Sequence, residues 1–331
     1  MGHLPPAALT NLHQLETAIW QVLAGQPITL VAARTHLAAH QLADAAERYQ
    51  AAGHATLARD TEHSGWLQIN IQFTTPRLAE NIMAEHVSPI LEDAERHYLV
   101  TNWWFIRKTP WWRLRWRPTP QTPPEPANDR LHSVLDTLQA AGHIVGHRPG
   151  IYEPEIVTFG GPTAVEIAHD LFHADSRNLL AHAHSTAATQ TRPTIDAPEL
   201  SILLCSALLR AAGQDLYEQG DIWARVSNHR PAHDATQRRT TLGPLRRLLT
   251  ADPRAANLPA NSPLSGHQPW IEAFHRAGTS LAETARRGTL QRGIRAILAH
   301  HVIFHWNRLG MPYAKQSVLA ASARDVILTH E

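Results

Sequence analysis

The sequence predicts an α+β fold, in which a ferredoxin-like antiparallel sheet is joined to a large C-terminal helical part and a small N-terminal helical module. Residues 66–157 give the order strand, helix, strand, strand, helix, strand, which is the ferredoxin-like order. Every periodic segment from residue 163 onward has helical spacing, and so does the chain before a polar, glycine-terminated stretch at residues 60–65. We therefore expect two domains, a helical module over residues 1–62 and a larger domain over residues 63–331.

The N-terminal module is predicted to consist of helices. Apolar residues from Leu12 to Leu23 keep a 3.6-residue spacing and stop at Gly25-Gln26-Pro27. The pattern returns from Leu37 to Ala52 and ends at Gly53, as expected for a helix that is closed by a glycine.

Alternating apolar and polar residues predict the strands of the larger domain. Trp66–Phe73 alternates with period 2, Tyr98–Lys108 is aromatic and β-branched, and Trp112–Arg117 alternates again. Short apolar pairs at Ile144-Val145 and Ile156-Val157 predict further short strands.

Two helices are expected between these strands. One covers Pro76–Arg96, with a bend at Pro89 because proline removes a backbone donor. The other is capped by Asn128 and stops at Gly142.

Helices are predicted for the rest of the chain. They cover Thr163–His184, Ala197–Ala212, Leu216–Asn228, Trp270–Arg287, Leu290–Leu309 and Pro312–Thr329. Between them, Arg230–Gly266 is expected to be a loop that carries a short helix at Leu242–Leu249.

Composition excludes several classes of protein. The 30 Lys and Arg residues are balanced by 29 Asp and Glu residues, so the chain lacks the basic excess of a protein that binds nucleic acid through many phosphates.

The lone cysteine, Cys205, lies in an apolar run and is expected to be a small buried side chain. No signal peptide or membrane-spanning run is evident, so we expect a cytoplasmic protein that does not contact a membrane.

The third predicted strand carries a row of arginines. Arg113, Arg115 and Arg117 share one face because side chains alternate along a strand. Three guanidinium groups in a row repel each other unless they face solvent or bind an anion or peptide carbonyls. The row therefore indicates either a solvated face or a site for a carboxylate or peptide.

Two histidines on a C-terminal helix form a second candidate site. His301 and His305 stand four residues apart, the spacing of two zinc ligands, but no third ligand is evident and we expect no metal. The two rings are either core residues or groups that transfer protons to a substrate.

Five ordered motifs point to one family. They are Trp103-Trp104-Phe105-Ile106-Arg107-Lys108, Trp112-Arg113-Leu114-Arg115, Tyr152-Glu153-Pro154-Glu155 with Phe159-Gly160-Gly161, Leu171-Phe172-His173-Ala174-Asp175-Ser176, and His305-Trp306-Asn307-Arg308-Leu309-Gly310. From about Trp66 to its end, the chain resembles the C-terminal domain of class I lantibiotic dehydratases, in the standalone form found in thiopeptide biosynthesis.

The resemblance implies one of two chemistries. Relatives either eliminate glutamate from glutamylated Ser or Thr, or join two dehydroalanines of a modified peptide by a formal aza-[4+2] cycloaddition that forms a pyridine macrocycle and expels the leader peptide. Eliminating domains usually carry an arginine near the diglycine, where this chain has Thr158-Phe159. We therefore expect a pyridine synthase, with two alternatives: a glutamate-eliminating partner of a split tRNA-dependent dehydratase, and a non-catalytic subunit that binds the leader peptide.

The chemistry of the side chains then identifies candidate residues for the site. The candidates for proton transfer are His301, His305, Tyr152, Glu155 and Tyr313. The candidates for contact with the peptide are Arg113, Arg115, Arg117, Trp103, Trp112, Asp175, Ser176, Asn307 and Arg308. No cofactor is expected, and the expected partners are a modified precursor peptide with thiazoles and dehydroalanines and other enzymes of the same pathway.

Overall fold

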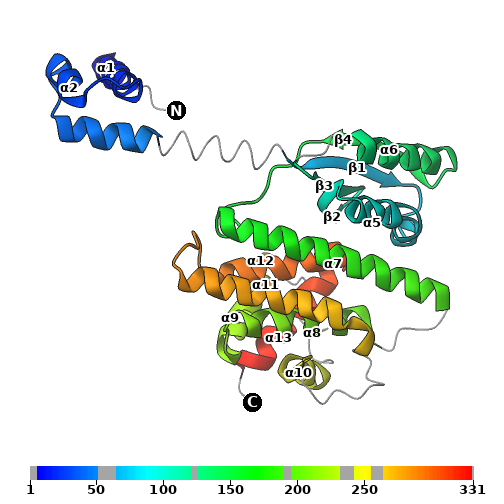
Figure 1. The fold of residues 1–331 in the computed structure, drawn as a ribbon. Coiled ribbons are helices and arrows are strands. Elements are labelled where there is room, and N and C mark those ends of the chain that lie inside the picture. Colours follow the sequence, from blue (N-terminus) through cyan, green and yellow to red (C-terminus); the bar gives the residue numbers. More distant parts are fainter. Residues whose placement is uncertain are drawn as a thin grey trace. The chain divides into compact units, whose positions relative to one another are not determined.

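The computed structural model describes residues 6–50, 65–120, 125–189, 195–231, 242–254 and 264–329. The chain forms two compact units, Met1–Gly65 and Trp66–Glu331, which are described separately (Figure 1). The expected end of a helix at Gly53 and the expected boundary near residue 62 lie outside the described residues.

The N-terminal unit is helical, as its periodicity predicts. It contains α1 (Pro6–Leu23), α2 (Ile28–Thr35) and a further helix over residues 39–50. These helices enclose a small core of buried apolar side chains, including Ile19, Val31 and Leu42. The spacing of apolar residues therefore predicted this unit correctly.

The larger unit begins with a four-stranded antiparallel sheet. Its strands are β1 (Leu67–Phe73), β2 (Val100–Lys108), β3 (Trp111–Pro118) and β4 (Ile144–Gly150), in the order β2-β3-β1-β4. This topology confirms the α+β prediction with a ferredoxin-like sheet.

Of three local expectations for this region, one holds in part and two are wrong. The expected helix over Pro76–Arg96 is divided into α4 (Ala79–Ile82), a π-helical turn η1 (Met83–Val87) and α5 (Ser88–Arg96). Pro89 lies in the first turn of α5, where its missing N–H is tolerated, so the chain changes its hydrogen-bonding pattern just before the proline.

The two wrong expectations concern the second helix and the strand expected after it. Helix α6 (Glu125–Ala140) starts before Asn128, whose side-chain oxygen accepts a hydrogen bond from Trp116 Nε1 at 2.9 Å instead of capping the helix. The expected strand at Ile156-Val157 is part of a turn over residues 156–160.

The two faces of the sheet differ in chemistry. One face carries Ile69, Ile71 and Leu114 and is buried together with apolar residues of α5 and α6. The other face carries Gln68, Arg115 and the other alternate residues of β1 and β3, as the strand register requires.

The edge strand β2 is covered by helices and not by another strand. Ser176 of α7 (Pro162–Thr189) accepts a hydrogen bond from the Phe105 N–H at 3.2 Å, and Arg308 of α12 (Ile294–Leu309) donates to the Phe105 carbonyl at 3.0 Å. His173 Nδ1 lies 2.9 Å from the Trp103 carbonyl oxygen. These contacts satisfy backbone N–H and C=O groups of β2. On an uncovered edge strand, such groups could pair with a strand of another molecule and cause aggregation.

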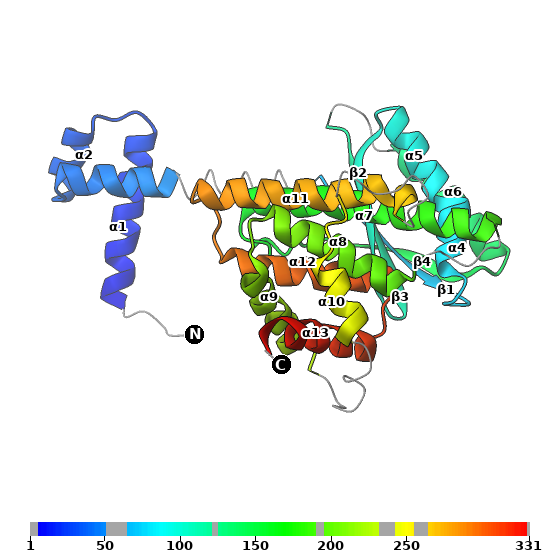
Figure 2. The same cartoon turned by 90° about the horizontal axis from the view of Figure 1, so that it is seen from below.

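Helices form the rest of the unit, in agreement with the predicted C-terminal part. They are α7, α8 (Ala197–Ala211), α9 (Leu216–His229), α10 (Leu242–Thr250), α11 (Gln268–Arg286), α12 and α13 (Tyr313–Leu328). Helix α11 packs against both α7 and α8 (Figures 1 and 2). Among the described residues, no helix combines the length and the apolar character that a membrane span requires.

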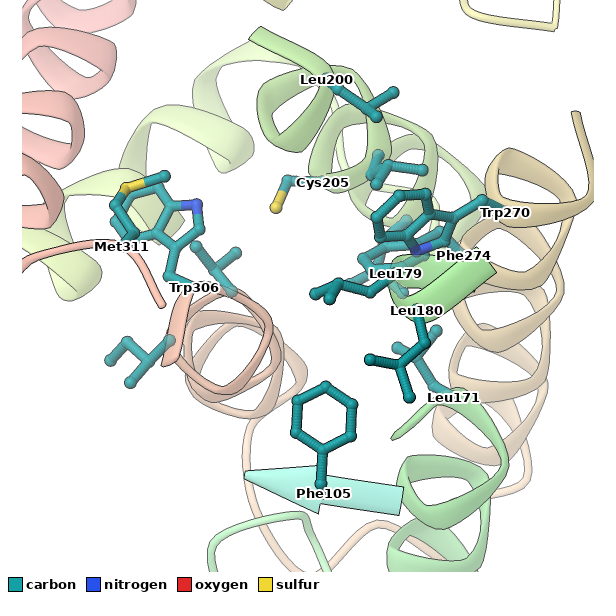
Figure 3. Close-up of a cluster of buried hydrophobic side chains, with 14 of the residues drawn as sticks. Phe105, Leu171, Leu179, Leu180, Leu200, Cys205, Trp270, Phe274, Trp306 and Met311 are labelled. Atoms are coloured by element: carbon teal, nitrogen blue, oxygen red, sulfur yellow. The ribbon is translucent and has the colours of Figure 1, made fainter. Parts of the chain in front are cut away.

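The core runs from the sheet into these helices. Phe105 of β2 lies at one end of a cluster that continues through Leu171, Phe274 and Trp306 (Figure 3). Cys205 is fully buried in this cluster, as expected, and burial raises the pKa of its thiol.

Candidate functional site

The central arginine of the row on β3 is buried and stacked between aromatic rings. Arg115 is only 3% exposed, and its Nε donates to Gln68 Oε1 at 2.7 Å. Its guanidinium carbon lies 4.3 Å from the Trp104 ring centroid and 4.0 Å from that of Tyr152. Burial lowers the pKa of Arg115 to about 10, so the group stays charged at neutral pH.

The three arginines share a strand face, but their surroundings differ. Arg113 is exposed, whereas Arg117 forms a bidentate ion pair with Glu166 of α7 at 2.7 and 2.9 Å. Of the two interpretations of the row, a solvated face therefore fits Arg113 alone, since Arg115 is buried and Arg117 is paired with Glu166.

A chain of hydrogen bonds leads from Tyr152 to Arg117. The Tyr152 hydroxyl lies 2.8 Å from His169 Nε2, and His169 Nδ1 lies 3.2 Å from Glu166 Oε1. A carboxylate only accepts hydrogen bonds, so Nδ1 carries the proton of the neutral ring and Tyr152 donates to Nε2. We call Gln68, Trp104, Arg115, Arg117, Tyr152, Glu155, Glu166 and His169 the sheet-face cluster.

Burial and hydrogen bonding shift the pKa values along this chain in different directions. Burial raises the pKa of Glu166, but hydrogen bonds from His169 and Arg117 outweigh it and lower the value to about 2. Burial lowers the pKa of His169 and raises that of Tyr152. Glu166 is therefore a carboxylate at neutral pH, and Tyr152 keeps its proton unless a base removes it.

Three polar atoms of the cluster are buried without a partner among the described residues. They are two donors, Arg115 Nη1 and Trp104 Nε1, and one acceptor, Glu155 Oε2. A buried polar atom without a partner costs free energy, and such atoms are typical of places where a ligand supplies the missing hydrogen bond. The cluster thus presents two free donors and one free acceptor beside the Tyr152 relay.

The turn after Tyr152 is fixed by two glycines. Gly160 and Gly161 have φ values of 92° and 106°, and a Cβ at Gly160 would lie 2.4 Å from Ile297 Cδ1. The Gly160 carbonyl accepts a hydrogen bond from the Gln291 N–H at 2.8 Å. The diglycine therefore lets the turn pack against the start of α12 and holds the segment that carries Tyr152 and Glu155.

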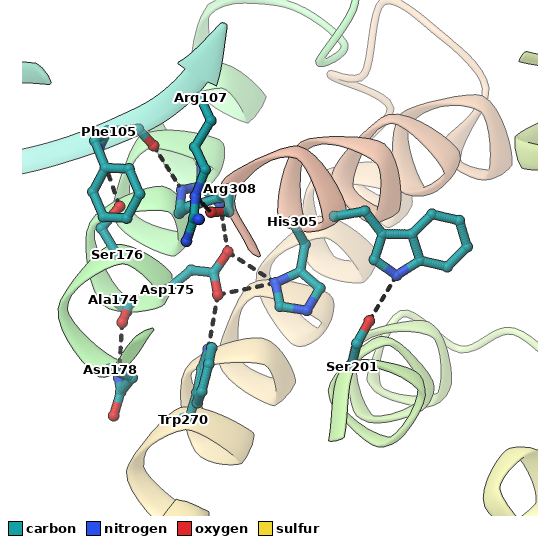
Figure 4. Close-up of polar contacts among 11 residues, drawn as sticks. Phe105, Arg107, Ala174, Asp175, Ser176, Asn178, Ser201, Trp270, His305 and Arg308 are labelled. Carbon is teal, nitrogen blue, oxygen red and sulfur yellow. Dashed lines mark hydrogen bonds and ion pairs between the residues drawn. The ribbon is translucent and has the colours of Figure 1, made fainter. Parts of the chain in front are cut away.

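A second buried polar group surrounds Asp175, which lies on α7. Its carboxylate accepts hydrogen bonds from Arg308 Nη1 at 2.5 Å, Trp270 Nε1 at 2.8 Å and His305 Nδ1 at 3.0 Å (Figure 4). Burial raises the pKa of Asp175, but His305 and Arg308 outweigh it, so the group is ionised. We call Asp175, Trp270, His305 and Arg308 the Asp175 network.

Arg308 connects the two groups. Its guanidinium carbon lies 4.7 Å from the Phe172 ring centroid and 5.8 Å from the Trp104 ring centroid, while Nη2 is buried without a partner among the described residues. The polar interior of the unit is therefore nearly continuous from the Asp175 network to the sheet-face cluster.

His301 and His305 lie in different surroundings although they share a helix face. His301 packs against Phe159 and Phe172, with ring centroids 5.0 and 6.0 Å apart, and both its nitrogens are buried without a partner among the described residues. Burial lowers the pKa of His301 to about 3. The two histidines consequently do not form one proton-transfer pair.

The structure does not bring all the predicted site residues together. Trp103 and Trp112 lie on the sheet face opposite to Arg115, and Trp112 stacks on Phe105 with centroids 4.8 Å apart. The expectation that these two rings contact the substrate is corrected, because both are core side chains.

Three other candidates serve structural contacts elsewhere. Ser176 covers the edge of β2, and Asn307 accepts a hydrogen bond from Gln316 of α13 at 3.2 Å. Tyr313 is half exposed at the start of α13, where Arg230 lies over its ring at 5.4 Å. None of the three lies in the sheet-face cluster.

Sequence reasoning missed three members of the cluster. Gln68, Glu166 and His169 lie outside the five sequence motifs of the family. The spacing of Glu166 and His169, three residues apart on a predicted helix, was the available signal for a Glu–His pair.

Comparisons with known proteins agree with this architecture. The family model described as the lantibiotic biosynthesis dehydratase C-terminal region matches residues 66–327, which confirms the family that the motifs indicate. A search of curated proteins found no match.

Solved structures show the same fold. The tRNA-dependent lantibiotic dehydratase MibB from Microbispora sp. 107891 aligns with a TM-score of 0.58 and 20% identity, over 78% of this chain and 28% of MibB. TbtD, the pyridine synthase from thiomuracin biosynthesis, aligns with a TM-score of 0.52 and 14% identity, over 79% of this chain and 97% of TbtD. TsrL aligns with a TM-score of 0.50 and 13% identity, over 80% of this chain and 100% of TsrL.

Proposed function

The chain belongs to the family of the lantibiotic dehydratase C-terminal domain, and on that premise we propose that it is a pyridine synthase of thiopeptide maturation. The reaction is a formal aza-[4+2] cycloaddition between two dehydroalanines of a modified precursor peptide. Loss of water and of the leader peptide as its amide then gives the pyridine macrocycle. The thiomuracin pyridine synthase shares the fold and has nearly all of its length covered by this chain.

The charge balance of the site carries this proposal. The guanidinium groups of Arg115, Arg117 and Arg308 are matched by the carboxylates of three residues: Glu155, Glu166 and Asp175. Two of the three arginines are already paired, at 2.7 and 2.5 Å. An eliminating site must stabilise a departing glutamate carboxylate and benefits from an excess of cations. A balanced site suits the neutral dehydroalanines and amides of a cycloaddition.

The sheet-face cluster offers the proton transfers that this reaction needs. One amide must become its iminol, so its nitrogen loses a proton and its oxygen takes one from solvent water. The proton that reaches His169 returns to solvent, so the tautomerisation is neutral overall. Arg115 Nη1, one of the two free donors, would hold the amide oxygen while Tyr152 takes the nitrogen proton and passes its own to His169. The Glu166 carboxylate, 3.2 Å from His169 Nδ1, stabilises the resulting imidazolium.

Glu155 completes the set. Its unpartnered Oε2 would accept the hydrogen bond of the iminol hydroxyl, which must leave later as water. The protein also contributes by holding two distant dehydroalanines together, which is worth up to roughly 7 to 11 kcal/mol of the barrier. Exposed Arg113 and the Arg148–Trp111 stack, with the guanidinium 4.5 Å from the ring centroid, lie on the same sheet face and would contact the peptide.

Glutamate elimination is the second candidate. Arg113 favours it, because this exposed residue lies two positions from Arg115 and could hold a glutamyl carboxylate. The Tyr152 relay could equally remove the α proton of the glutamylated residue. The two reactions use different substrates, so substrate tests separate them.

Mass spectrometry of the purified full chain with two peptides tests the proposal. A linear thiazole peptide with a leader and two dehydroalanines should give a leader amide and a core that is lighter by the leader and one water. If that peptide is unchanged while a glutamylated serine peptide loses glutamate, the protein is an eliminating enzyme.

A pair of variants tests the relay. Tyr152→Phe keeps the ring that stacks on Arg115 but removes the hydroxyl, and we expect at least a 100-fold loss of turnover. Tyr98→Phe is the matched control, since Tyr98 is 79% exposed, and it should keep wild-type turnover. Normal turnover of a folded Tyr152→Phe protein would remove the relay from the mechanism.

A further inference from the structure

A cavity of about 320 Å³ lies between α4 and helices α7, α8, α11 and α12. Its walls are mostly apolar and include Leu179, Ala183, Leu200 and Leu204. The volume is at the lower end of the range of small-molecule pockets. The cavity is lined by none of the residues of the sheet-face cluster, so the proposed cycloaddition does not account for it.

His305 supplies the polar anchor of this cavity. The ring is only 2% exposed, it lines the cavity, and its Nε2 is buried without a partner among the described residues. In Figure 4 the ring directs Nδ1 at Asp175 and its second nitrogen away from the Asp175 network, toward the side of α8 that carries Ser201. Ser201 is also a lining residue, so Nε2 faces the cavity.

The network fixes what His305 can offer to a ligand. Asp175 is a carboxylate and only accepts hydrogen bonds, so the uncharged tautomer of the ring that fits this contact has its proton on Nδ1 and an acceptor at Nε2. Arg308 pairs with Asp175 at 2.5 Å, so the carboxylate has a cationic partner besides the ring. Three groups hold the carboxylate, which leaves the ring little freedom to turn.

We propose that this cavity is a binding site for an apolar ligand that carries a single hydroxyl or N–H donor, with phenol as the simplest example. The ligand's apolar body would fill the leucine-lined volume, and its donor would complete the hydrogen bond of His305 Nε2. The Trp270 ring, which also lines the cavity, favours an aromatic body. Asn81 is exposed and His182 half-buried at the same cavity, which gives the ligand a route from solvent.

Calorimetric titration of the full chain with phenol and toluene tests this site. The two probes have nearly the same size and shape, but only phenol has a donor. Phenol should bind saturably with one site, and toluene should bind at least tenfold more weakly. Equal affinity for the two probes, or no binding of phenol, would overturn the proposal.

Two matched variants place the site without disturbing the network. Ala183→Leu puts a larger side chain into the cavity and should weaken phenol binding at least tenfold. Ala181→Leu makes the same change at an exposed position of α7 and should leave phenol binding unchanged. Equal effects of the two variants would show that phenol binds elsewhere and would contradict the assignment.

A third probe separates the two sources of such a ligand. N-acetyltyrosinamide carries the same phenol on a peptide-like backbone. If it competes with phenol, the site takes a peptide side chain, and if only phenol binds, the site takes a free small molecule. Both results support the site, and neither depends on turnover, so they remain informative if the cycloaddition proposal fails.

Discussion

At the scale of single residues, His301 makes the stability of the protein depend on pH. Burial among Phe159 and Phe172 lowers the pKa of its ring to about 3, whereas a histidine in an unfolded chain titrates near 6.5. Between these values the unfolded state binds one more proton than the folded state. The free energy of unfolding therefore falls as the pH drops from about 6.5 to 3, by at most about 1.4 kcal/mol per pH unit.

His301→Phe should remove this contribution. Phenylalanine fills the aromatic surroundings without a titrating group, so its packing cost is the same at every pH. Urea unfolding between pH 7 and pH 4 should give a flatter dependence for the variant than for the wild type. Parallel curves for the two proteins would show that His301 is not the source.

At the scale of elements, the packing of α11 on α8 depends on a single glycine. A Cβ at Gly278 would lie 2.3 Å from the Leu208 carbonyl oxygen and 2.8 Å from the Cβ of Ala211. Gly278→Ala should therefore destabilise the protein by about 1 to 3 kcal/mol, although alanine favours a helix by up to about 1 kcal/mol. Urea unfolding at neutral pH measures this cost.

Gly266→Ala is the control for that substitution. A Cβ at Gly266 meets no atom within 4 Å, so the change should alter the free energy of unfolding by less than about 0.5 kcal/mol. If both variants unfold at the same urea concentration, α8 and α11 can separate slightly at no cost and the close contact is unimportant.

Periodicity predicted the elements whose stability comes from one buried face. Strand β1 and helices such as α11 follow from regularly spaced apolar residues, because burial of that face selects the period. The π-helical turn η1 could not be predicted, since it depends on how the chain accommodates Pro89 against the sheet. The strand expected at Ile156-Val157 fails because two apolar residues do not distinguish a strand from a turn held by the following diglycine.

Only those residues of the candidate site that belong to sequence motifs could be predicted. The arginine row on β3 and Tyr152 were identified from the sequence, but their hydrogen-bond partners come from elements far along the chain. Trp103 and Trp112 were wrongly expected to contact the substrate. The abundance of aromatic rings suggested a groove, but the pairing of β2 with β3 places both on the buried face of the sheet. Pairing partners such as His169 become visible only after α7 is packed against the sheet.

At the scale of the whole molecule, the family region and the N-terminal unit are separate. The family model begins at residue 66, where the second compact unit begins. The N-terminal unit has its own small core but leaves Trp20, Leu23 and Leu30 exposed at 58%, 40% and 45%. Exposed apolar groups on a small unit are typical of a surface that binds another chain. We therefore expect this unit to bind the leader of the precursor peptide.

Deletion of residues 1–63 tests that role. The remaining chain keeps the sheet and the helical core, so it should stay folded by circular dichroism, while its affinity for a fluorescently labelled leader should fall at least tenfold by anisotropy. Trp20→Ala in the full chain should weaken binding in the same direction, since it removes the largest exposed ring. If the truncated protein binds the leader as tightly as the full chain, leader recognition belongs to residues 66–331, and the exposed sheet face around Arg113 becomes the surface to mutate next.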